Sequence, residues 1–241
     1  MFEGSVAALH RWPVKSLRGE RVGAARFDDR GMAGDRAFAL IDQRAKRSGR
    51  VLTVRQNPGM LAWGSAYGST VDADAPPTLS APDGTRWSWT DPDLPDALTE
   101  SFGVPLDLRA ADGQQDRGPT VLVTIEASRL ALEQELGAPV DVDRFRANVH
   151  LTLDAPAFAE EHWGPGTTLT VGEVELAIVG DRAGPCIRCA VPSWDLAGRE
   201  RWPKLQTWLI EQHENKFGLI MRATRPGVAR VGDAAWLRPG E

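Results

Sequence analysis

The sequence predicts a mainly β fold with a few helices, of the α+β class and barrel-like in architecture. Short apolar runs recur along the chain and are separated by clusters of Gly, Pro and Asp, which is typical of short strands joined by turns. Only a few stretches have a helical pattern. The sequence contains no internal repeat and no glycine fingerprint of a nucleotide-binding α/β fold.

The first half of the chain predicts a series of short strands. They fall at residues 5–10, 21–28, 37–41, 61–67, 78–80, 86–89 and 106–109. The Ala-Pro-Asp-Gly sequence at 81–84 predicts a turn between two of them, and the stretch 72–77 predicts a loop. A short helix is expected within 91–102.

The polar, glycine-rich stretch 111–119 is the best internal boundary. It predicts two parts, an N-terminal barrel-like region at 1–112 and a second domain at 113–239. The strands expected after the boundary lie at 121–125, 146–153, 168–171, 174–179, 219–223 and 234–237.

Two helices are expected in the second part. One spans 126–136 and has Gly137 as its stop signal. The leucines expected on its buried side are Leu130, Leu132 and Leu136. The other spans 203–212 and has Pro203 in its first turn, where the missing N–H costs nothing.

Composition and charge exclude several classes of function. The formal net charge of −5 argues against general affinity for nucleic acids or acidic membranes. No apolar run approaches the roughly 20 residues of a membrane span, and the first residues do not resemble a signal peptide, so we expect a cytoplasmic protein. The two cysteines are too few for a disulfide framework, or for the four thiolates of an ordinary Fe–S cluster.

The most informative segment is Gly-Pro-Cys-Ile-Arg-Cys at 184–189, which contains Cys186 and Cys189. Half a zinc site would need partners among four histidines, none of which forms an HxxxH pair. A thioredoxin-like pair would open a helix early in an α/β fold, and a purely structural pair is the third interpretation. Arg188 favours a functional thiol, because a flanking cation stabilises the thiolate that binds soft metals.

Two segments of the first half carry groups suited to an anion. Lys15 and Ser16, in a loop after a strand, offer a charge and a hydroxyl that suit phosphate, although an exposed lysine is the commoner meaning of such a pair. In Gly-Met-Ala-Gly-Asp-Arg at 31–36, the glycines allow close backbone approach. Arg36 there is either an anion clamp or the partner of Asp35.

A third such segment lies in the second half. Arg146 and Asn148 alternate along the expected strand 146–153, so we expect both to project from one face. A guanidinium beside a carboxamide can recognise a phosphate or the edge of a heterocycle. The alternative is an ordinary solvated strand face.

Taken together and in this order, these segments resemble the MOSC domain family, and the resemblance covers nearly the whole chain. The matching segments are PVKS (13–16), GMAGDR (31–36), RFRANV (144–149), AEEHW (159–163), GPCIRC (184–189), FG (217–218) and VGD (231–233). The resemblance implies a MOSC β-barrel domain packed with an N-terminal MOSC β-barrel region.

The resemblance also implies a site for the molybdenum cofactor, Mo-molybdopterin. The second Cys of the C-x-R-C motif, Cys189, corresponds to the catalytic thiolate ligand of the metal in related reductases. The implied cofactor-binding residues are Lys15, Ser16, Arg36, Arg146, Asn148, Ile187, Arg188 and Cys189. The loop 116–118 matches loosely and is not included, and Cys186 has no clear role as a ligand.

Relatives of this kind include the mitochondrial amidoxime-reducing component, bacterial reductases and the C-terminal region of molybdenum cofactor sulfurases. The resemblance therefore implies an oxidoreductase that reduces amidoximes, hydroxylamines or N-hydroxylated bases. Its electrons would come from a separate ferredoxin, flavodoxin or cytochrome b5-like protein. Pyridoxal phosphate is not expected, because the lyase domain of the sulfurases is missing. The alternatives are a cofactor carrier or sulfur-delivery protein, and a barrel without metal.

Overall fold

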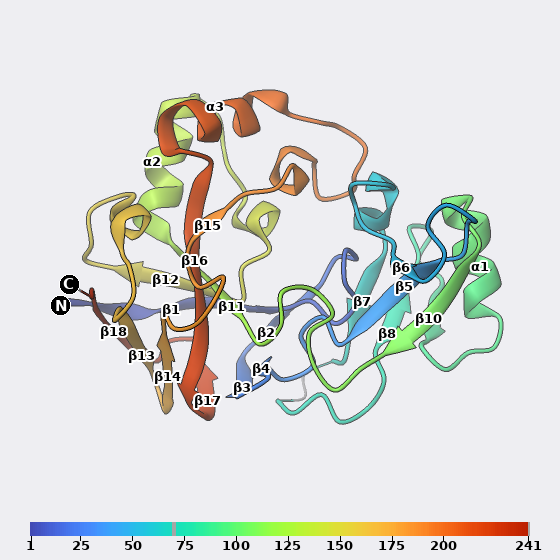
Figure 1. Ribbon diagram of the computed structural model, residues 1–241, viewed down its shortest axis with the longest axis horizontal. Coiled ribbons are helices and arrows are strands. Elements are labelled where there is room, and N and C mark those ends of the chain that lie inside the picture. Colours follow the sequence, from blue (N-terminus) through green and yellow to red (C-terminus); the bar gives the residue numbers. More distant parts are fainter. Residues whose placement is uncertain (69–70, 241) are drawn as a thin grey trace.

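The computed structural model describes residues 1–68 and 71–240 and confirms a mainly β architecture (Figure 1). Within these residues, seven strands close into a barrel, because the last strand of the series pairs with the first. In order around the barrel they are β11 (Val121–Ile125), β12 (Val149–Leu153), β1 (Phe2–Arg11), β18 (Ala234–Arg238), β13 (Thr168–Val171), β14 (Val174–Ala177) and β16 (Lys216–Arg225).

Pairing around the barrel is antiparallel except between β11 and β12. Two further strands extend it: β2 (Glu20–Val22) pairs with β1, and β15 (Gly184–Ile187) pairs with β16. Alternate residues of the strands point inward, as in β11, where Val121, Val123 and Ile125 are buried. The barrel is therefore filled by branched aliphatic side chains and is not a pore.

The first strand of the chain is an integral part of this barrel. Phe2 lies opposite Leu237 of β18, and Gly4 lies opposite Leu153 of β12. The division into 1–112 and 113–239 stays a prediction. In the structure, strand β1 completes a barrel whose other six strands come from residues after 120.

A smaller lobe lies beside the barrel (Figure 1). Two three-stranded sheets build it, one of β10 (Leu106–Ala110), β5 (Phe38–Asp42) and β6 (Arg50–Val51), the other of β7 (Gly64–Ala66), β8 (Thr78–Ser80) and β9 (Arg86–Ser88). Helix α1 (Leu94–Phe102) packs on them around a separate apolar core. The strand expected at 61–67 is shorter, because Pro58–Ala62 forms the 3₁₀ helix η1, capped by Asn57.

Two α-helices and a small sheet complete the larger lobe. Helices α2 (Glu126–Leu136) and α3 (Pro203–His213) share a third apolar core, in which the Phe145 and Phe217 rings stack at 3.9 Å. The small sheet contains β17 (Gly227–Arg230), β3 (Ala24–Asp28) and β4 (Gly31–Met32). Short 3₁₀ helices lie at η2 (Val142–Phe145), η3 (Ala159–His162) and η4 (Val191–Ser193).

Two expectations about the second half were wrong. The strand expected at 146–153 begins only at Val149, because Arg146 has a left-handed backbone (φ 55°) that ends η2. In helix α2, Leu130 is 44% exposed, and Ser128 is buried with Leu132 instead. Positions four apart share a helix face, whereas positions two apart do not.

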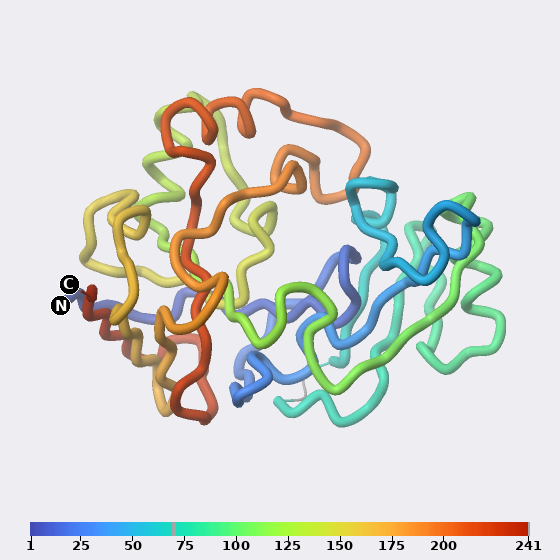
Figure 2. The backbone as a smooth tube through the Cα atoms, viewed as in Figure 1, coloured from blue at the N-terminus to red at the C-terminus, as the bar shows by residue number. Residues whose placement is uncertain are grey.

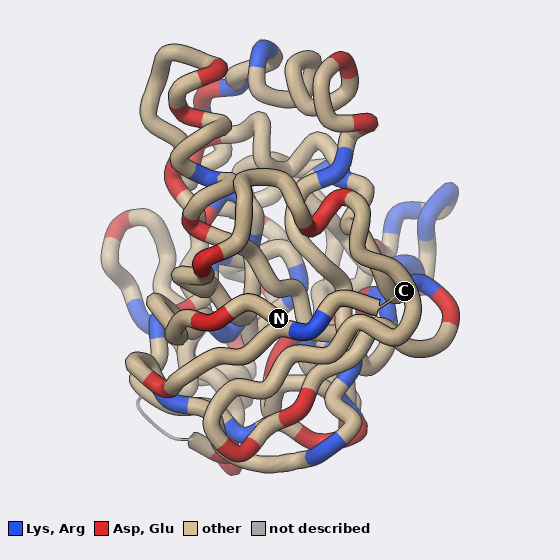
Figure 3. The backbone as a smooth tube through the Cα atoms, turned by 90° about the vertical axis from the view of Figure 1, so that its left-hand side faces the viewer, with Lys and Arg blue, Asp and Glu red and all other residues tan. Residues whose placement is uncertain are grey.

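Several segments pass between the lobes (Figure 2). The stretch 111–119 is one of these segments. The loop after β15 reaches η1 of the small lobe, where a Cβ on Gly198 would lie 1.9 Å from the carbonyl oxygen of Pro58. Basic and acidic residues are interspersed along the backbone on the face shown in Figure 3. No helix of the described residues is long and apolar enough to cross a membrane.

Candidate functional site

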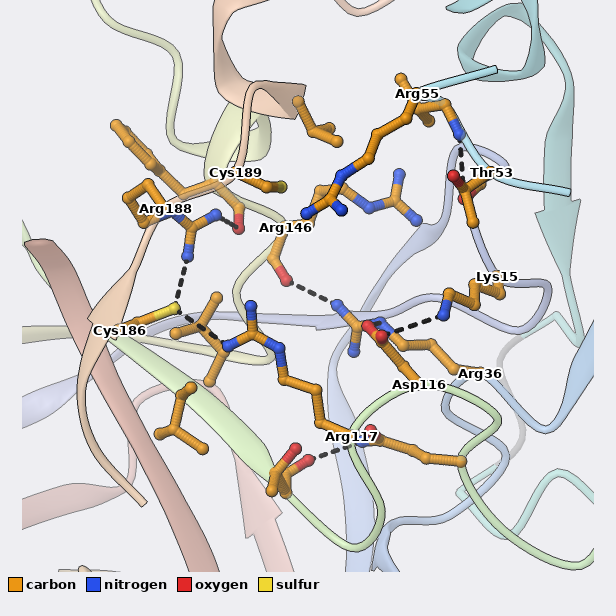
Figure 4. A pocket seen from close by; sticks show the side chains of 18 of the residues that line it. Lys15, Arg36, Thr53, Arg55, Asp116, Arg117, Arg146, Cys186, Arg188 and Cys189 are labelled. Atoms are coloured by element: carbon orange, nitrogen blue, oxygen red, sulfur yellow. Dashed lines mark hydrogen bonds and ion pairs between the residues drawn. The ribbon is translucent and has the colours of Figure 1, made fainter. Parts of the chain in front are cut away.

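A cavity of about 400 Å³ is lined by residues of both lobes. Most of the residues singled out from the sequence meet there, although they are far apart in the chain (Figure 4). Its charged lining consists of seven cations and a single carboxylate: Lys15, Arg36, Arg47, Arg55, Arg117, Arg146, Arg188 and Asp116. This excess of positive charge favours anionic ligands over cationic ones.

Lys15 and Ser16 enter the cavity from the turn that follows β1. The Lys15 Nζ donates to Asp116 Oδ1 at 3.0 Å and to the Gln115 carbonyl at 3.3 Å. Ser16 has a left-handed backbone (φ 75°), and its hydroxyl accepts a 3.4 Å hydrogen bond from the amide of Val54. Lys15 is therefore held by the 111–119 loop, not free in solvent.

Arg36 is placed by the turn between β4 and β5. Its backbone is left-handed (φ 50°), and its guanidinium pairs with the buried Asp35. The guanidinium also donates to the carbonyl of Arg146 at 3.0 Å and lies 4.0 Å from Asp116. The two interpretations of this arginine are therefore compatible, since it pairs with Asp35 and also lines the cavity.

Arg146 faces the same cavity from the end of η2. Its Nη2 donates to the Leu17 carbonyl at 2.8 Å, and its guanidinium lies 4.2 Å from the centre of the Trp12 ring. Burial, together with the neighbouring Arg36, lowers the pKa of Arg146 to about 9. A bound anion would relieve this repulsion, because it would supply the missing negative charge.

Asp116 is the carboxylate among these cations. Burial raises the pKa of Asp116, but the charges of Arg36 and Lys15 outweigh it, and the pKa lies below its ordinary value. The residue therefore stays ionised and holds both cations near each other. The sequence indicated this loop only loosely.

Asn148 lies at the base of the cavity and is fully buried. Its Oδ1 accepts from the amide of Leu122 at 3.1 Å and from Arg36 at 3.5 Å. Its Nδ2 donates to the His10 carbonyl at 3.4 Å. The carboxamide thus ties β1, β11 and Arg36 together, and recognition of a heterocycle by this residue stays a prediction.

The two cysteines differ in surroundings. Cys186, in β15, is 2% exposed, and its sulfur lies 3.1 Å from Arg188 Nη1 and 3.5 Å from Arg117 Nη1. Cys189 follows β15, is half-buried and lines the cavity, so its thiol is the accessible one. Ile187 is 54% exposed and is not among the residues that line the cavity.

Arg188 has one unsatisfied donor. Its Nη2 donates to the Phe145 carbonyl at 2.7 Å, whereas its buried Nε has no hydrogen-bond partner among the described residues. Such a donor costs free energy unless a ligand or water accepts from it. Together with the accessible thiol and the cations, it fits a site for a ligand that carries a phosphate and a metal.

Sequence reasoning did not include four charged residues of the lining in the site. Arg117 and Asp116 lie on the 111–119 loop, whose alignment was too loose to use. Arg47 and Arg55 come from the small lobe, on both sides of β6. The signal that could have found them is the density of basic residues from 44 to 55 in an acidic chain. Among the described residues, no group of three or more His, Cys, Asp or Glu side chains could hold a metal ion.

Two family models match most of the chain. Residues 114–235 match the family model of the MOSC domain, and residues 3–91 match that of the MOSC N-terminal beta barrel domain. Similar solved structures include the YuaD protein from Bacillus subtilis, with 12% identity, a TM-score of 0.49 and both chains covered completely. YiiM from Geobacillus stearothermophilus has 17% identity and a TM-score of 0.37 over 49% of this chain and 53% of its own. No curated protein matches the sequence directly.

Proposed function

Because the chain belongs to the MOSC domain family, whose members are associated with the molybdenum cofactor, we propose that it binds this cofactor in the cavity between its lobes. We further propose that it is an oxidoreductase that reduces N-hydroxylated substrates. One observation carries the first proposal. Lys15, Arg36 and Arg146 line the same cavity as the accessible thiol of Cys189. Molybdopterin needs these groups, since it brings a phosphate and a metal to the same site.

The positions of the lining residues support the proposed roles. Lys15, Arg36 and Arg146 hold the phosphate, and Ser16 offers a hydroxyl beside them. Cys189 is the protein's ligand to the metal, because it is the thiol that is accessible in the cavity. The bound metal supplies two-electron oxygen-atom chemistry. Arg188 contacts the sulfur of Cys186 through Nη1 at 3.1 Å, and its buried Nε, which has no partner among the described residues, would donate to the bound cofactor.

The reductase activity rests on the resemblance to the amidoxime-reducing component and related bacterial enzymes. The electrons come, in this proposal, from a separate ferredoxin, flavodoxin or cytochrome b5-like protein. The second candidate function is a carrier that holds the cofactor or delivers sulfur without turnover of its own. The same cavity would serve it, because binding needs the phosphate clamp and the thiol but no substrate.

The test begins with protein made in a host that synthesises the cofactor. Molybdenum is measured by elemental analysis, and the pterin by mass spectrometry of the released cofactor. Reduction of benzamidoxime is then followed with reduced methyl viologen as the electron donor. Molybdenum with turnover supports the reductase, and molybdenum without turnover of any N-hydroxylated compound supports the carrier. Protein without molybdenum or pterin would refute both.

A further inference from the structure

The cavity has one cation that neither the cofactor phosphate nor the protein accounts for. Lys15 pairs with Asp116, Arg36 with Asp35, and Arg47 with Asp42 at 3.0 Å. Among the described residues, four arginines line the cavity without a hydrogen-bonded or ion-paired carboxylate, and two of them, Arg117 and Arg188, donate to the Cys186 sulfur instead. The other two are Arg55 and Arg146. Arg146 lies with Arg36 in the proposed phosphate clamp, so Arg55 remains.

Arg55 is well placed to meet a molecule that enters the cavity. It is exposed although it lines the cavity, so it lies where the cavity opens to solvent. Its side chain extends from the small lobe toward the side of the cavity that carries Cys189 (Figure 4). It therefore stands near the proposed position of the metal but comes from a different lobe than the thiol.

The backbone that carries Arg55 is fixed by its neighbours. The amide of Gln56 donates to the Thr53 carbonyl at 2.9 Å, and the Thr53 hydroxyl donates to Gln56 Oε1 at 2.7 Å. The amide of Val54 donates to the hydroxyl of Ser16, which itself lines the cavity. Arg55 is thus held at the tip of a closed turn that is anchored beside the proposed phosphate clamp.

We propose that Arg55 is an anion subsite for the substrate, and that the preferred substrates carry a carboxylate or a phosphate. This rests on the proposed function, since it names the class of substrate for the same cavity. A neutral substrate would leave the Arg55 charge uncompensated in a cavity that already has an excess of cations. An anionic group on Arg55 restores the balance and directs the other end of the molecule toward Cys189.

The test measures binding apart from turnover. The oxidised, molybdenum-loaded protein is titrated calorimetrically, without an electron donor, with two matched pairs of compounds. One pair is para-carboxybenzamidoxime and benzamidoxime, and the other is N-hydroxyadenosine monophosphate and N-hydroxyadenosine. We expect the anionic member of at least one pair to bind about tenfold to a hundredfold more tightly, and the pair that shows this identifies the anion.

Two variants test the residue. Arg55→Gln should reduce the ratio of the two dissociation constants to near one, and Arg55→Lys should restore part of it. Arg50→Gln is the matched control, because Arg50 is an exposed arginine on the same segment that does not line the cavity. It should leave the ratio unchanged. Equal binding of charged and neutral compounds, or an equal effect of the Arg55 and Arg50 substitutions, would overturn the subsite.

Different experimental outcomes refute the anion subsite and the reductase proposal. Selective binding of the anionic compounds without reduction of any compound by viologen refutes the reductase and supports the subsite. Reduction without charge selectivity refutes the subsite alone. If the protein carries no molybdenum, the proposed function is refuted, and the same titration on that protein still decides the subsite.

Discussion

Glu160 is a buried carboxyl whose ionisation should weaken the fold at alkaline pH. It lies in η3, is 1% exposed, and accepts one hydrogen bond from the Ser128 hydroxyl at 2.8 Å. Its other oxygen, Oε1, has no partner among the described residues. Burial raises the pKa of Glu160 from 4.5 to about 7. The folded protein therefore binds the proton more tightly than the unfolded chain does.

Proton linkage determines whether the free energy of unfolding rises or falls with pH. Between the two pKa values the unfolded chain loses the proton and the folded protein keeps it, so the free energy of unfolding falls as the pH rises through this window. Above about pH 7 both states are ionised, and the loss is complete at roughly 3 kcal/mol, since each pKa unit corresponds to about 1.4 kcal/mol. The Glu160→Gln variant cannot ionise and therefore escapes this loss.

The measurement is the denaturant unfolding of wild type and Glu160→Gln at about pH 5 and about pH 8.5. The stability of the variant relative to wild type should increase by about 2–3 kcal/mol between the two pH values. The substitution also changes the stability by an amount that does not depend on pH, and this amount cancels when the two pH values are compared. Ser128→Ala is a control that removes the hydrogen bond but keeps the carboxyl, so the pH dependence should persist. A relative stability that does not change with pH would show that Glu160 is not protonated in the folded protein.

Three further predictions concern the site and the barrel. Cys189→Ala should lose molybdenum, measured by elemental analysis, with an unchanged circular dichroism spectrum, while Cys186→Ala retains more of it; equal loss in both variants would contradict a single thiolate ligand. Arg36→Lys should weaken cofactor retention roughly tenfold to a hundredfold in dialysis, because an ammonium cannot pair with Asp35 and a phosphate as a guanidinium fork does; full retention would exclude Arg36 from the clamp. A fragment of residues 120–241 should be insoluble or unable to hold cofactor, because it lacks strand β1 of the barrel; a stable, loaded fragment would refute this.

Most of the fold could be predicted because its strands are short, apolar and separated by clear turn signals. The bounds expected for β11, β13 and α2 agree with the structure. Strand β15 was not expected, because Pro185 lies inside it and proline normally weakens a strand. Its pairing with β16 is a long-range contact that no local pattern shows. The closure of the barrel by β1 could not be predicted from the sequence for the same reason.

The sequence indicated which residues line the cavity better than it indicated their geometry. Arg146 was expected to face the pocket as part of a strand. It does face the pocket, but from a left-handed turn, a conformation that local sequence favours only for glycine and asparagine. Arg55 could not be recognised, because its role depends on a turn of the small lobe that folds against Ser16. Charge density alone does not show which of several arginines reaches the cavity.

The place of β1 in the barrel has a consequence for the order in which the chain folds during synthesis. Its partner β12 is made well past the middle of the chain, and its partner β18 is made near the end. The core of the small lobe, in contrast, is built from residues 14–106 and can assemble as soon as that segment has emerged. The edge of the first strand that pairs with β18 must therefore wait unpaired until nearly the whole polypeptide has left the ribosome. Such a strand exposes the nascent protein to mispairing, and slow translation should prolong that exposure.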